Sequence, residues 1–553
     1  LLKTFFNGKK IPVIPPLLHN NEFVNDFHEK ATIFNDYFAS QCTTISTNSV
    51  IPNEINFLTD KKIDTAEFDE NDIKSIINAL NPSKAHGHDG ISIRMLRLSV
   101  DSVSKPLLLI FKNCFLNGTF PTTWKKANVV PIHKKSNRHI NSNYRPVSLL
   151  PICGKIFERI LYRALHNHLN DNFLLCESQS GFRCGDSCVN QLLSITNMIY
   201  SSFDKNPSLE VRGVFLDISR AFDRVWHAGL LYKLESIGVT GKLLKLTESF
   251  LNERYQRVVL NGVTSEWSCI KAGVPQGSIL GPLFFLIYIN DLTTGLKCDV
   301  KLFADDTSLF SVVHDSNLSA IDLNHDLQII SDWANKWKMS FNPDPAKQAQ
   351  EVIFSRKLHQ VNNPNVYFNQ CAVQNTNTQK HLGVVLDSKL SFNLHMKEKI
   401  SKANKGIGVI KRLQKYVPRS SLLTIYKSFV RPHLDYADIL YDQPNNESFS
   451  NKIESVQYNA SLAITGAIRG TSREKLYVEL GLEYLSARRW FRKMTFFYKL
   501  LQNQSPKYLF NILEQNLRIH NTRSANTLKV PFCRTDYYKN SFFPYTINEW
   551  NKL

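Results

Sequence analysis

Two adjacent carboxylates in the middle of the chain have the spacing that metal chemistry requires. Asp305 and Asp306 lie between two short segments rich in strand-forming residues, 300–303 and 308–313. This pattern predicts a tight β-hairpin that presents both acids at one edge of a sheet. Two carboxylates at such a short distance repel each other unless a cation lies between them. Oxygen ligands of this type suit Mg²⁺. Aspartate is also a common turn residue, so the pair alone does not identify a site.

A third acid, Asp217, ends an apolar segment upstream of this hairpin. Residues 211–216 predict a short buried strand, and residues 218–226 follow with helix-like spacing. An acid at the end of a buried strand is well placed to meet a hairpin on the neighbouring strands. Three converging carboxylates are what a two-metal phosphoryl-transfer site needs, with the ions roughly 4 Å apart.

A glycine- and proline-rich segment, 273–282, lies between these acids and reads Gly-Val-Pro-Gln-Gly-Ser-Ile-Leu-Gly-Pro. Its glycines allow close approach of the backbone to a ligand, and Pro282 can open a helix predicted over 283–292. An ordinary turn before a buried helix would show the same pattern. The segment indicates a ligand-binding loop only in combination with the acids on either side of it in the sequence.

Taken together, these blocks resemble the reverse transcriptases of non-LTR retrotransposons of the jockey-like type. Leu216–Asp223 is similar to the first catalytic block of that family, and Gly273–Pro282 is similar to its G-x-P-Q-G block. Phe303–Asp306 matches the F-A-D-D box. The three blocks occur in the order that the family shows.

The resemblance extends from about residue 80 to residue 500. Further similar blocks lie at residues 83–91, 124–135, 143–150, 179–183, 337–342 and 381–387. Gln179–Arg183, which reads Q-S-G-F-R, matches an insertion that distinguishes non-LTR and group II intron enzymes from retroviral ones.

The resemblance implies an α+β fold of the right-hand polymerase type. We expect fingers and palm over residues 81–386, with an antiparallel palm sheet covered by helices, and a helical thumb and C-terminal region over 387–553. Residues 1–80 form a predicted N-terminal extension with a mostly helical pattern. Because the chain starts with Leu1 rather than Met and stops at Leu553 without a helix-ending signal, we expect that it is cut at both ends. It would then be the polymerase portion of a longer frame or a degraded copy of it.

The implied activity is RNA-directed DNA polymerisation, a nucleotidyl transfer that adds dNTPs to a primer 3′-hydroxyl. The expected partners are an RNA template, a DNA primer or target, and dNTPs. Asp217, Asp305 and Asp306 are the predicted catalytic residues and metal ligands. They would hold two Mg²⁺ ions, with Mn²⁺ as an alternative.

The resemblance also implies a set of residues that contact the incoming nucleotide: Arg145, Ile218, Ser219, Phe222, Gln276, Gly277 and Lys347. Arg145 resembles a fingers arginine that clamps phosphates with its planar guanidinium, although a structural surface role is the alternative. The backbone at Ile218 and Ser219 is expected to hold the triphosphate. Phe222 occupies the place of an aromatic gate against the 2′-hydroxyl, with simple packing as the alternative. Lys347 lies where family members carry a lysine near the leaving pyrophosphate.

The charge of the chain agrees with a nucleic-acid partner. The 553 residues carry a net charge of +19, and a protein this basic usually meets a polyanion. Residues 397–529 hold 23 Lys and Arg against 10 Asp and Glu. In a thumb, this excess predicts contacts to the phosphate backbone, for which we select Arg488 and Arg489. An ordinary solvated face is the alternative.

Other classes of protein find little support. The ten cysteines include no Cys-x-x-Cys pair, so a zinc knuckle or a disulfide framework is not indicated. The densest apolar run, 279–289, is too short to span a bilayer, and no signal peptide is visible. We therefore expect an intracellular protein of the nucleus, the cytoplasm or both.

Two alternative functions stay open at this point. A group II intron-type reverse transcriptase with maturase activity shares the Gln179–Arg183 insertion, but residues 223–227 and 434–438 look like the retrotransposon type. A decayed, non-catalytic RNA-binding copy is the other alternative, and the intact acids count against it. The template RNA, the target site and the oligomeric state cannot be derived from the sequence.

Overall fold

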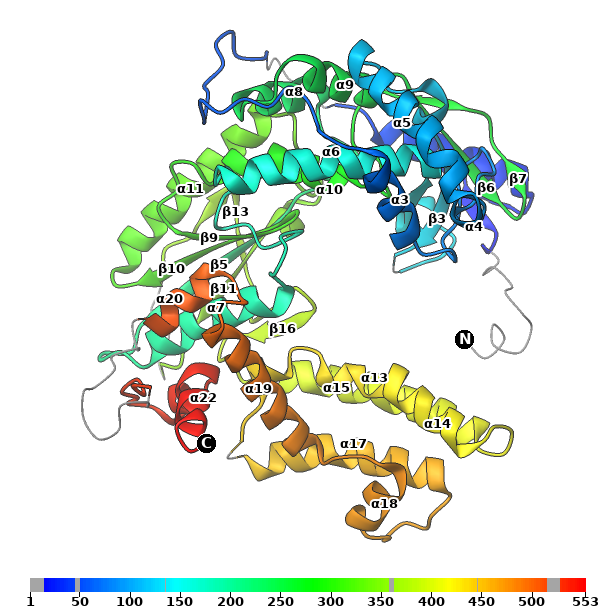
Figure 1. The fold of residues 1–553 in the computed structure, drawn as a ribbon. Helices are drawn as coiled ribbons and strands as arrows, with labels where there is room; N and C mark the ends of the chain where they lie inside the picture. The colour runs from blue at the N-terminus through cyan, green and yellow to red at the C-terminus, as the bar shows by residue number, and fades with distance from the viewer. Residues whose placement is uncertain (1–13, 45–49, 135, 358–362, 445, 515–527) are drawn as a thin grey trace. The chain divides into compact units, whose positions relative to one another are not determined.

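The computed structural model describes residues 14–44, 50–134, 136–357, 363–444, 446–514 and 528–553. The chain divides into two compact units, and each unit is assembled from three separated stretches of the chain (Figure 1). The first unit comprises residues 1–176, 218–295 and 329–343, and the second comprises residues 177–217, 296–328 and 344–553.

The first unit contains a small mixed sheet. Its strands are β3 (Lys126–His133), β4 (Tyr144–Leu149), β6 (Arg254–Leu260), β7 (Val263–Thr264) and β8 (Ser268–Ile270). They lie in the order β4-β3-β6-β7, and β8 also pairs with β6. The strand β3 is antiparallel to β4 and parallel to β6. Side chains along β6 alternate between buried and more exposed positions, as expected for a strand with one face in a core.

Helices surround this sheet and account for most of the first unit. They are α2 (Phe27–Gln41), α3 (Glu70–Ala79), α4 (Ile93–Leu98), α5 (Val100–Asn117), α6 (Ile152–Asp171), α8 (His227–Ser236), α9 (Gly241–Leu251) and α10 (Leu280–Ile289), with 3₁₀ turns η1 (Thr122–Lys125), η2 (Asn141–Asn143) and η3 (Asn290–Thr293). Helix α2 packs on the sheet, where Phe34 meets Tyr144 edge to face with ring centroids 4.9 Å apart. The core of the unit lies between these helices and the sheet.

The N-terminal extension is helical only in part. Residues 17–24 form a hairpin of β1 (Leu17–His19) and β2 (Glu22–Val24), which precedes α2. From residue 50 to the start of α3 the chain has almost no regular secondary structure. Residues 1–13 and 45–49 of the predicted extension lie outside the described residues.

Helix α10 explains the densest apolar run of the sequence. All of its residues except Pro282 are buried, so the run is a core helix. It begins at Leu280, with Pro282 in its first turn, where the missing N–H of proline costs nothing. Among the described residues, no helix combines the length and the apolar character that a membrane span requires.

The second unit is built around a five-stranded sheet. Its strands are β5 (Glu210–Asp217), β9 (Asp299–Phe303), β10 (Asp306–Val313), β11 (Ala349–Phe354) and β14 (Gln374–Asn375). They lie in the order β14-β11-β5-β10-β9. All neighbours are antiparallel except β11 and β14. The central strand β5 is buried along its whole length until its last residue, Asp217.

Helix α7 (Cys188–Phe203) packs against β5, and small hairpins lie farther along the chain. The remaining elements up to residue 387 are α11 (Ser316–Lys336), whose last turns belong to the first unit, α12 (Pro345–Gln348), β12 (Tyr367–Phe368), β13 (Cys371–Ala372), β15 (Thr378–His381) and β16 (Val384–Asp387). The mixture of helices with a mainly antiparallel sheet agrees with the α+β class predicted from the sequence.

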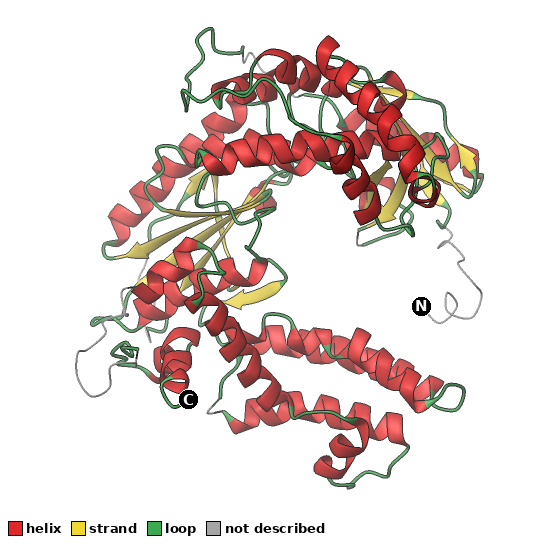
Figure 2. Ribbon diagram, viewed as in Figure 1, coloured by secondary structure: helices red, strands yellow, loops and turns green. Residues whose placement is uncertain are grey.

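Every element that the structure describes after residue 392 is a helix (Figure 2). These helices are α13 (Asn393–Leu413), α14 (Arg419–Ile425), the π-helical turn η4 (Tyr426–Val430), α15 (Pro432–Asp435), α16 (Asp438–Tyr441), α17 (Glu447–Thr465), α18 (Arg473–Leu480), α19 (Leu485–Leu501), α20 (Lys507–Glu514), α21 (Asp536–Lys539) and α22 (Phe542–Trp550). Their ends follow ordinary capping chemistry. For α17, the Asn446 side chain accepts a hydrogen bond from Phe449 N, and Gly466 closes the helix in the left-handed region.

Candidate active site

Three acids of the second unit lie at one edge of its sheet. The strand β5 ends at Asp217, β10 begins at Asp306, and the strand register pairs these two residues directly. Because directly opposed residues of an antiparallel pair project to the same face, both carboxylates leave the sheet on one side, and both are exposed. Asp305 is the second residue of the two-residue turn between β9 and β10 and is half-buried. The hairpin and its meeting with Asp217 are therefore as the sequence predicts.

The donor chemistry of this edge fits a hard divalent cation. Carboxylate oxygens are the ligands that Mg²⁺ prefers, and two of the three side chains are exposed on the same face. Across the described ranges of the chain, no three His, Cys, Asp or Glu side chains are grouped closely enough to form a ready-made metal centre. The three acids thus offer oxygen ligands that suit a divalent cation, but their side chains are not already grouped as a complete metal site.

The glycine-rich loop of the first unit, residues 273–278, lies against β4. Ser148 N donates a hydrogen bond to Gln276 O at 2.8 Å. Gly277 has a φ of +136°, and a Cβ at this position would lie 2.3 Å from Ser148 O. Only glycine fits such an approach, so the loop is held against the strand that carries Arg145, whose side chain is exposed.

A buried carboxylate, Glu158 of α6, holds the far end of this loop. One oxygen, Oε2, accepts hydrogen bonds from Ser278 Oγ at 2.6 Å, Ile279 N at 2.6 Å and Leu280 N at 3.3 Å. Glu158 is 2% exposed. The sequence analysis missed this residue, although an acid on the apolar face of a predicted helix is the signal that would have found it.

The segment between Asp217 and helix α8 is not helical, so the helix-like spacing of residues 218–226 gave a wrong prediction. The chain turns here, with Arg220 at a φ of +53°. The loop 273–278 binds two backbone carbonyls that would accept hydrogen bonds within a helix. Val274 N donates to Phe222 O and Gly273 N donates to Val225 O, both at 2.8 Å. Tertiary hydrogen bonds therefore replace the helical ones.

Phe222 and its neighbour Asp223 connect this turn to the core and to the loop. The ring of Phe222 stacks on Phe285 with centroids 5.0 Å apart, and Phe222 is half-buried. Gln276 Nε2 donates to Asp223 Oδ1 at 2.9 Å. Burial raises the pKa of Asp223 to about 6, although the bond from Gln276 acts in the opposite direction. Packing accounts for part of the Phe222 surface, as the alternative interpretation required.

The other predicted nucleotide contacts differ in their accessibility. Ile218 is buried and bridges to Phe341 in the first unit. Ser219 N donates to Ser340 O at 2.8 Å, so this amide is already engaged. Lys347 belongs to the second unit, is largely exposed in α12 and lies 2.5 Å from a carboxylate oxygen of Asp344.

Arg488 and Arg489 are both paired with acids, which does not favour the phosphate-binding role predicted for them. Arg489 is only 4% exposed, and its Nε donates to Asp442 at 2.8 Å. Arg488 pairs with Asp435, with Nη2 3.1 Å from Oδ2. Both arginines lie on α19 and neutralise acids in or next to α15 and α16. A count of basic residues does not show which of them are paired with acids inside the fold.

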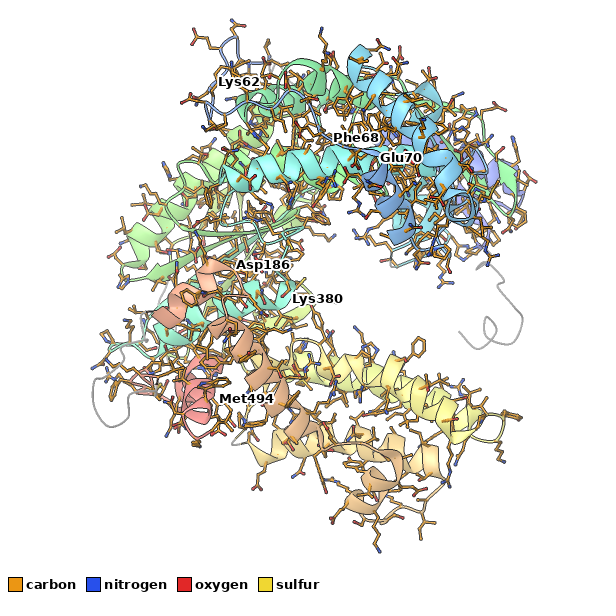
Figure 3. All side chains as sticks on the ribbon, in the orientation of Figure 1. Lys62, Phe68, Glu70, Asp186, Lys380 and Met494 are labelled. Atoms are coloured by element: carbon orange, nitrogen blue, oxygen red, sulfur yellow. The ribbon has the colours of Figure 1, made fainter. Side chains whose placement is uncertain are left out.

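A different basic cluster lies at the start of the helical region. Lys399 and Lys402 of α13 lie near Lys380 of β15. Lys380 is exposed and is labelled in Figure 3. Burial and the repulsion from the other two lysines lower the pKa of Lys399. Burial, together with the same three cations, lowers the pKa of His395 to about 4. Burial, together with Lys399 and Lys402, also lowers the pKa of His433. Mutually repelling cations of this kind favour a polyanion at their surface.

Comparison with known proteins agrees with the geometry of the acids. Residues 132–386 match the family model described as reverse transcriptase (RNA-dependent DNA polymerase). The chain is 31% identical over 460 residues to the RNA-directed DNA polymerase from mobile element jockey of Drosophila melanogaster, covering 80% of this chain and 48% of that protein. Its counterpart in Drosophila funebris is 32% identical over 413 residues, covering 72% and 44%.

A third relative belongs to another element of the same kind. The probable RNA-directed DNA polymerase from transposon X-element of Drosophila melanogaster is 29% identical over 412 residues, covering 72% of this chain and 44% of that protein. The chain thus spans about half the length of these curated relatives. The resemblance predicted from the sequence is confirmed.

Proposed function

We propose that this chain, which carries a reverse transcriptase domain of the jockey-like non-LTR type, is an RNA-directed DNA polymerase. It adds dNTPs to the 3′-hydroxyl of a primer paired with an RNA template. The observation that carries this proposal is the register between β5 and β10, which opposes Asp217 to Asp306 beside the turn residue Asp305. The printed names of the relatives support the same reaction.

Asp217, Asp305 and Asp306 bind two Mg²⁺ ions in this proposal, and Mn²⁺ can replace them. When bound, divalent ions lower the pKa of the primer hydroxyl and neutralise charge on the leaving pyrophosphate. The exposure of Asp217 and Asp306 on one face leaves both side chains accessible to substrate and solvent. The protein supplies the fixed orientation of its carboxylates, because β5 is buried up to its last residue.

The incoming nucleotide is bound by residues outside this group of acids. The exposed Arg145 pairs with its phosphates, and the loop of Gln276 and Gly277 contacts the base pair being formed. Ile218 and Ser219 lie beside the triphosphate. Ser219 contacts the triphosphate through its hydroxyl in this proposal, since its backbone amide already donates to Ser340 O. In the same proposal, Phe222 excludes the 2′-hydroxyl and Lys347 contacts the leaving group.

The nucleic acid runs along the helical part of the chain. We assign residues 81–386 to fingers and palm, residues 387–553 to the thumb and C-terminal region, and residues 1–80 to an N-terminal extension. Lys380, Lys399 and Lys402 contact the phosphates in this proposal, because Arg488 and Arg489 are already paired with acids. An RNA template and dNTPs as substrates imply an intracellular location, in the nucleus, the cytoplasm or both.

The test is a primer-extension assay with an RNA template, a DNA primer and all four dNTPs. The chain should extend the primer in the presence of Mg²⁺ and should stop when a chelator removes the ion. Binding of labelled template–primer is measured in parallel. Tight binding without extension in either Mg²⁺ or Mn²⁺ would support the decayed, RNA-binding alternative instead.

A further inference from the structure

The outer edge of the second unit's sheet is covered by residues 178–181. Gln179 forms a parallel bridge with Leu302 of β9. Ser180 N donates to Leu302 O at 2.8 Å, and Leu302 N donates to Ser178 O at 2.9 Å. Because β9 is the last strand in the sheet order, this segment satisfies the edge of the strand that leads into Asp305.

The side chain of Gln179 reaches the tip of the hairpin. Its Oε1 accepts hydrogen bonds from Ala304 N at 2.9 Å and from Gly181 N at 2.8 Å. Gln179 is 5% exposed, so these bonds are shielded from water. Ala304 is the first residue of the turn, and Asp305 is the second. One buried amide oxygen is thus bonded to the residue next to a candidate metal ligand.

The turn itself needs such support. Ala304 has a φ of +55°, a left-handed conformation that is unfavourable for a residue with a Cβ. Conformations of this kind persist where the surrounding structure fixes them, and they concentrate at functional sites. Gly181 shows how closely the covering segment approaches, because a Cβ there would lie 2.3 Å from Ala304 N.

The covering segment is anchored at its other end by helix α20. Tyr508 Oη donates to Asp186 Oδ1 at 2.8 Å and lies 3.3 Å from Ser180 Oγ (Figure 3). Burial raises the pKa of Asp186, which is the expected result when a carboxylate is enclosed by packing. Within the segment, Gln179 therefore contacts the hairpin tip and Ser180 contacts helix α20.

We propose that Gln179 is a positioning residue that fixes the direction of Asp305 through the amide of Ala304. This inference rests on the proposed polymerase function, because it assigns Asp305 a metal-binding role. Glutamine suits the position because its amide oxygen accepts two hydrogen bonds without adding a negative charge beside three acids. The short Gln179–Gly181 segment thereby links the family insertion to the catalytic hairpin.

The test compares two buried glutamines, of which Gln179 bonds to the turn and Gln191 bonds to the strand β9 that leads into it. Gln179→Met keeps the length of the side chain and removes its acceptor, and Gln179→Glu keeps the acceptor. Gln191→Met is the matched control, because Gln191 is 1% exposed and donates to Leu302 O at 2.9 Å without reaching the turn. The readouts are the extension rate, the Mg²⁺ concentration that gives half of the maximal rate, the melting temperature, and hydrogen exchange of residues 300–307.

We expect Gln179→Met to lower the extension rate about 100-fold, as a misplaced reacting group does, and to raise the Mg²⁺ requirement. Exchange at the hairpin tip should accelerate, and Gln179→Glu should restore most of the protection. Gln191→Met should lower the melting temperature while leaving the Mg²⁺ requirement and the tip's protection unchanged.

Equal shifts in Mg²⁺ requirement and exchange for the Met variants of Gln179 and Gln191 would overturn the inference, and so would unchanged exchange in Gln179→Met. The wild-type chain could fail to extend a primer while hydrogen exchange at the hairpin tip still depends on Gln179 and not on Gln191. That result would instead refute the polymerase function, since hydrogen exchange does not depend on turnover. The two failures are therefore distinguishable.

Discussion

Two loops of this protein are each held by one buried side chain, and the two side chains differ in charge. In the first unit, Glu158 accepts three hydrogen bonds from the end of the loop 273–278 and the start of α10. In the second unit, Gln179 accepts two hydrogen bonds from the hairpin tip and its own segment. The geometry is similar, because an oxygen acceptor binds backbone amides in both cases.

The difference follows from what surrounds each acceptor. Glu158 lies at the N-terminus of α10, where unpaired amides and the helix dipole favour a negative charge. Burial lowers the pKa of the nearby Arg254 to about 10, and the charge of Glu158 acts in the opposite direction. Gln179 lies beside Asp305, where another negative charge would be repelled. The electrostatic surroundings select carboxylate or amide, whereas the hydrogen-bond geometry requires only an oxygen.

The largest effect should come from the hairpin that Gln179 supports. Asp305→Asn keeps the shape of the side chain and removes an anionic ligand, so extension should fall by about 10³-fold or more. Primer–template binding should persist. The matched control is Asp299→Asn, an acid at the other end of β9 that pairs with Lys301. Single-turnover rates measure both, and a near wild-type rate for Asp305→Asn would remove this residue from the site.

The next largest effect should come from Glu158, and it should change different kinetic parameters from those that Gln179 changes. Glu158→Ala leaves three buried donors without an acceptor, which should cost about 2–4 kcal/mol of unfolding free energy and raise the KM for dNTP. Glu158→Gln keeps one acceptor oxygen and should lose less. Chemical denaturation and steady-state kinetics measure the two quantities. If Glu158→Ala changes kcat and the Mg²⁺ requirement but not KM, the contrast with Gln179 fails.

A smaller effect concerns the choice of sugar. Phe222→Ala should increase the use of ribonucleotides relative to deoxynucleotides on the order of 10-fold, because the ring no longer occupies the space of a 2′-hydroxyl. Loss of the stacking contact with Phe285 should also lower stability. Incorporation efficiencies for both sugars give the ratio. A ratio that stays constant while stability falls would leave Phe222 with a packing role alone.

The smallest effect distinguishes cations that lie beside other cations from a cation that is paired with an acid. Replacing Lys399 and Lys402 together by Ala should reduce the slope of log affinity against log salt by about 2, one unit for each lost phosphate contact. Arg488→Ala should lower stability and leave the slope unchanged, since this arginine pairs with Asp435. Binding isotherms at several salt concentrations provide the slopes. Identical slopes for wild type and the double lysine variant would contradict the proposed path of the nucleic acid.

Local patterns in the sequence were sufficient to predict the hairpin and the strand that carry the candidate metal ligands, whereas the resemblance to a known family identified the acids as ligands. The hairpin at Asp305 and the buried strand that ends at Asp217 depend on alternation and turn chemistry over fewer than ten residues, as the bounds of β5, β9 and β10 confirm. Such signals depend only on residues that are neighbours in the sequence, so they can be read without knowledge of the rest of the fold.

The supports of the site could not be predicted in this way. Gln179 and Ala304 are separated by 125 positions, and Glu158 and Ile279 by 121. A hydrogen bond between a side chain and a distant backbone amide leaves no periodic pattern. The buried ion pair of Arg489 was missed for a related reason, because the partner Asp442 becomes a neighbour only when α16 and α19 pack.

The interleaving of the two units has a consequence for synthesis. The strand β5 is completed at residue 217, but its neighbours β10 and β11 are completed only at residues 313 and 354. A growing chain therefore exposes an apolar strand with two open edges until residue 313 and with one open edge until residue 354. Non-local pairing of this kind is slow, and unpaired edges invite aggregation. Ribosomes that stop before residue 354 should release insoluble fragments, and transient binding by chaperones should be strongest over that interval.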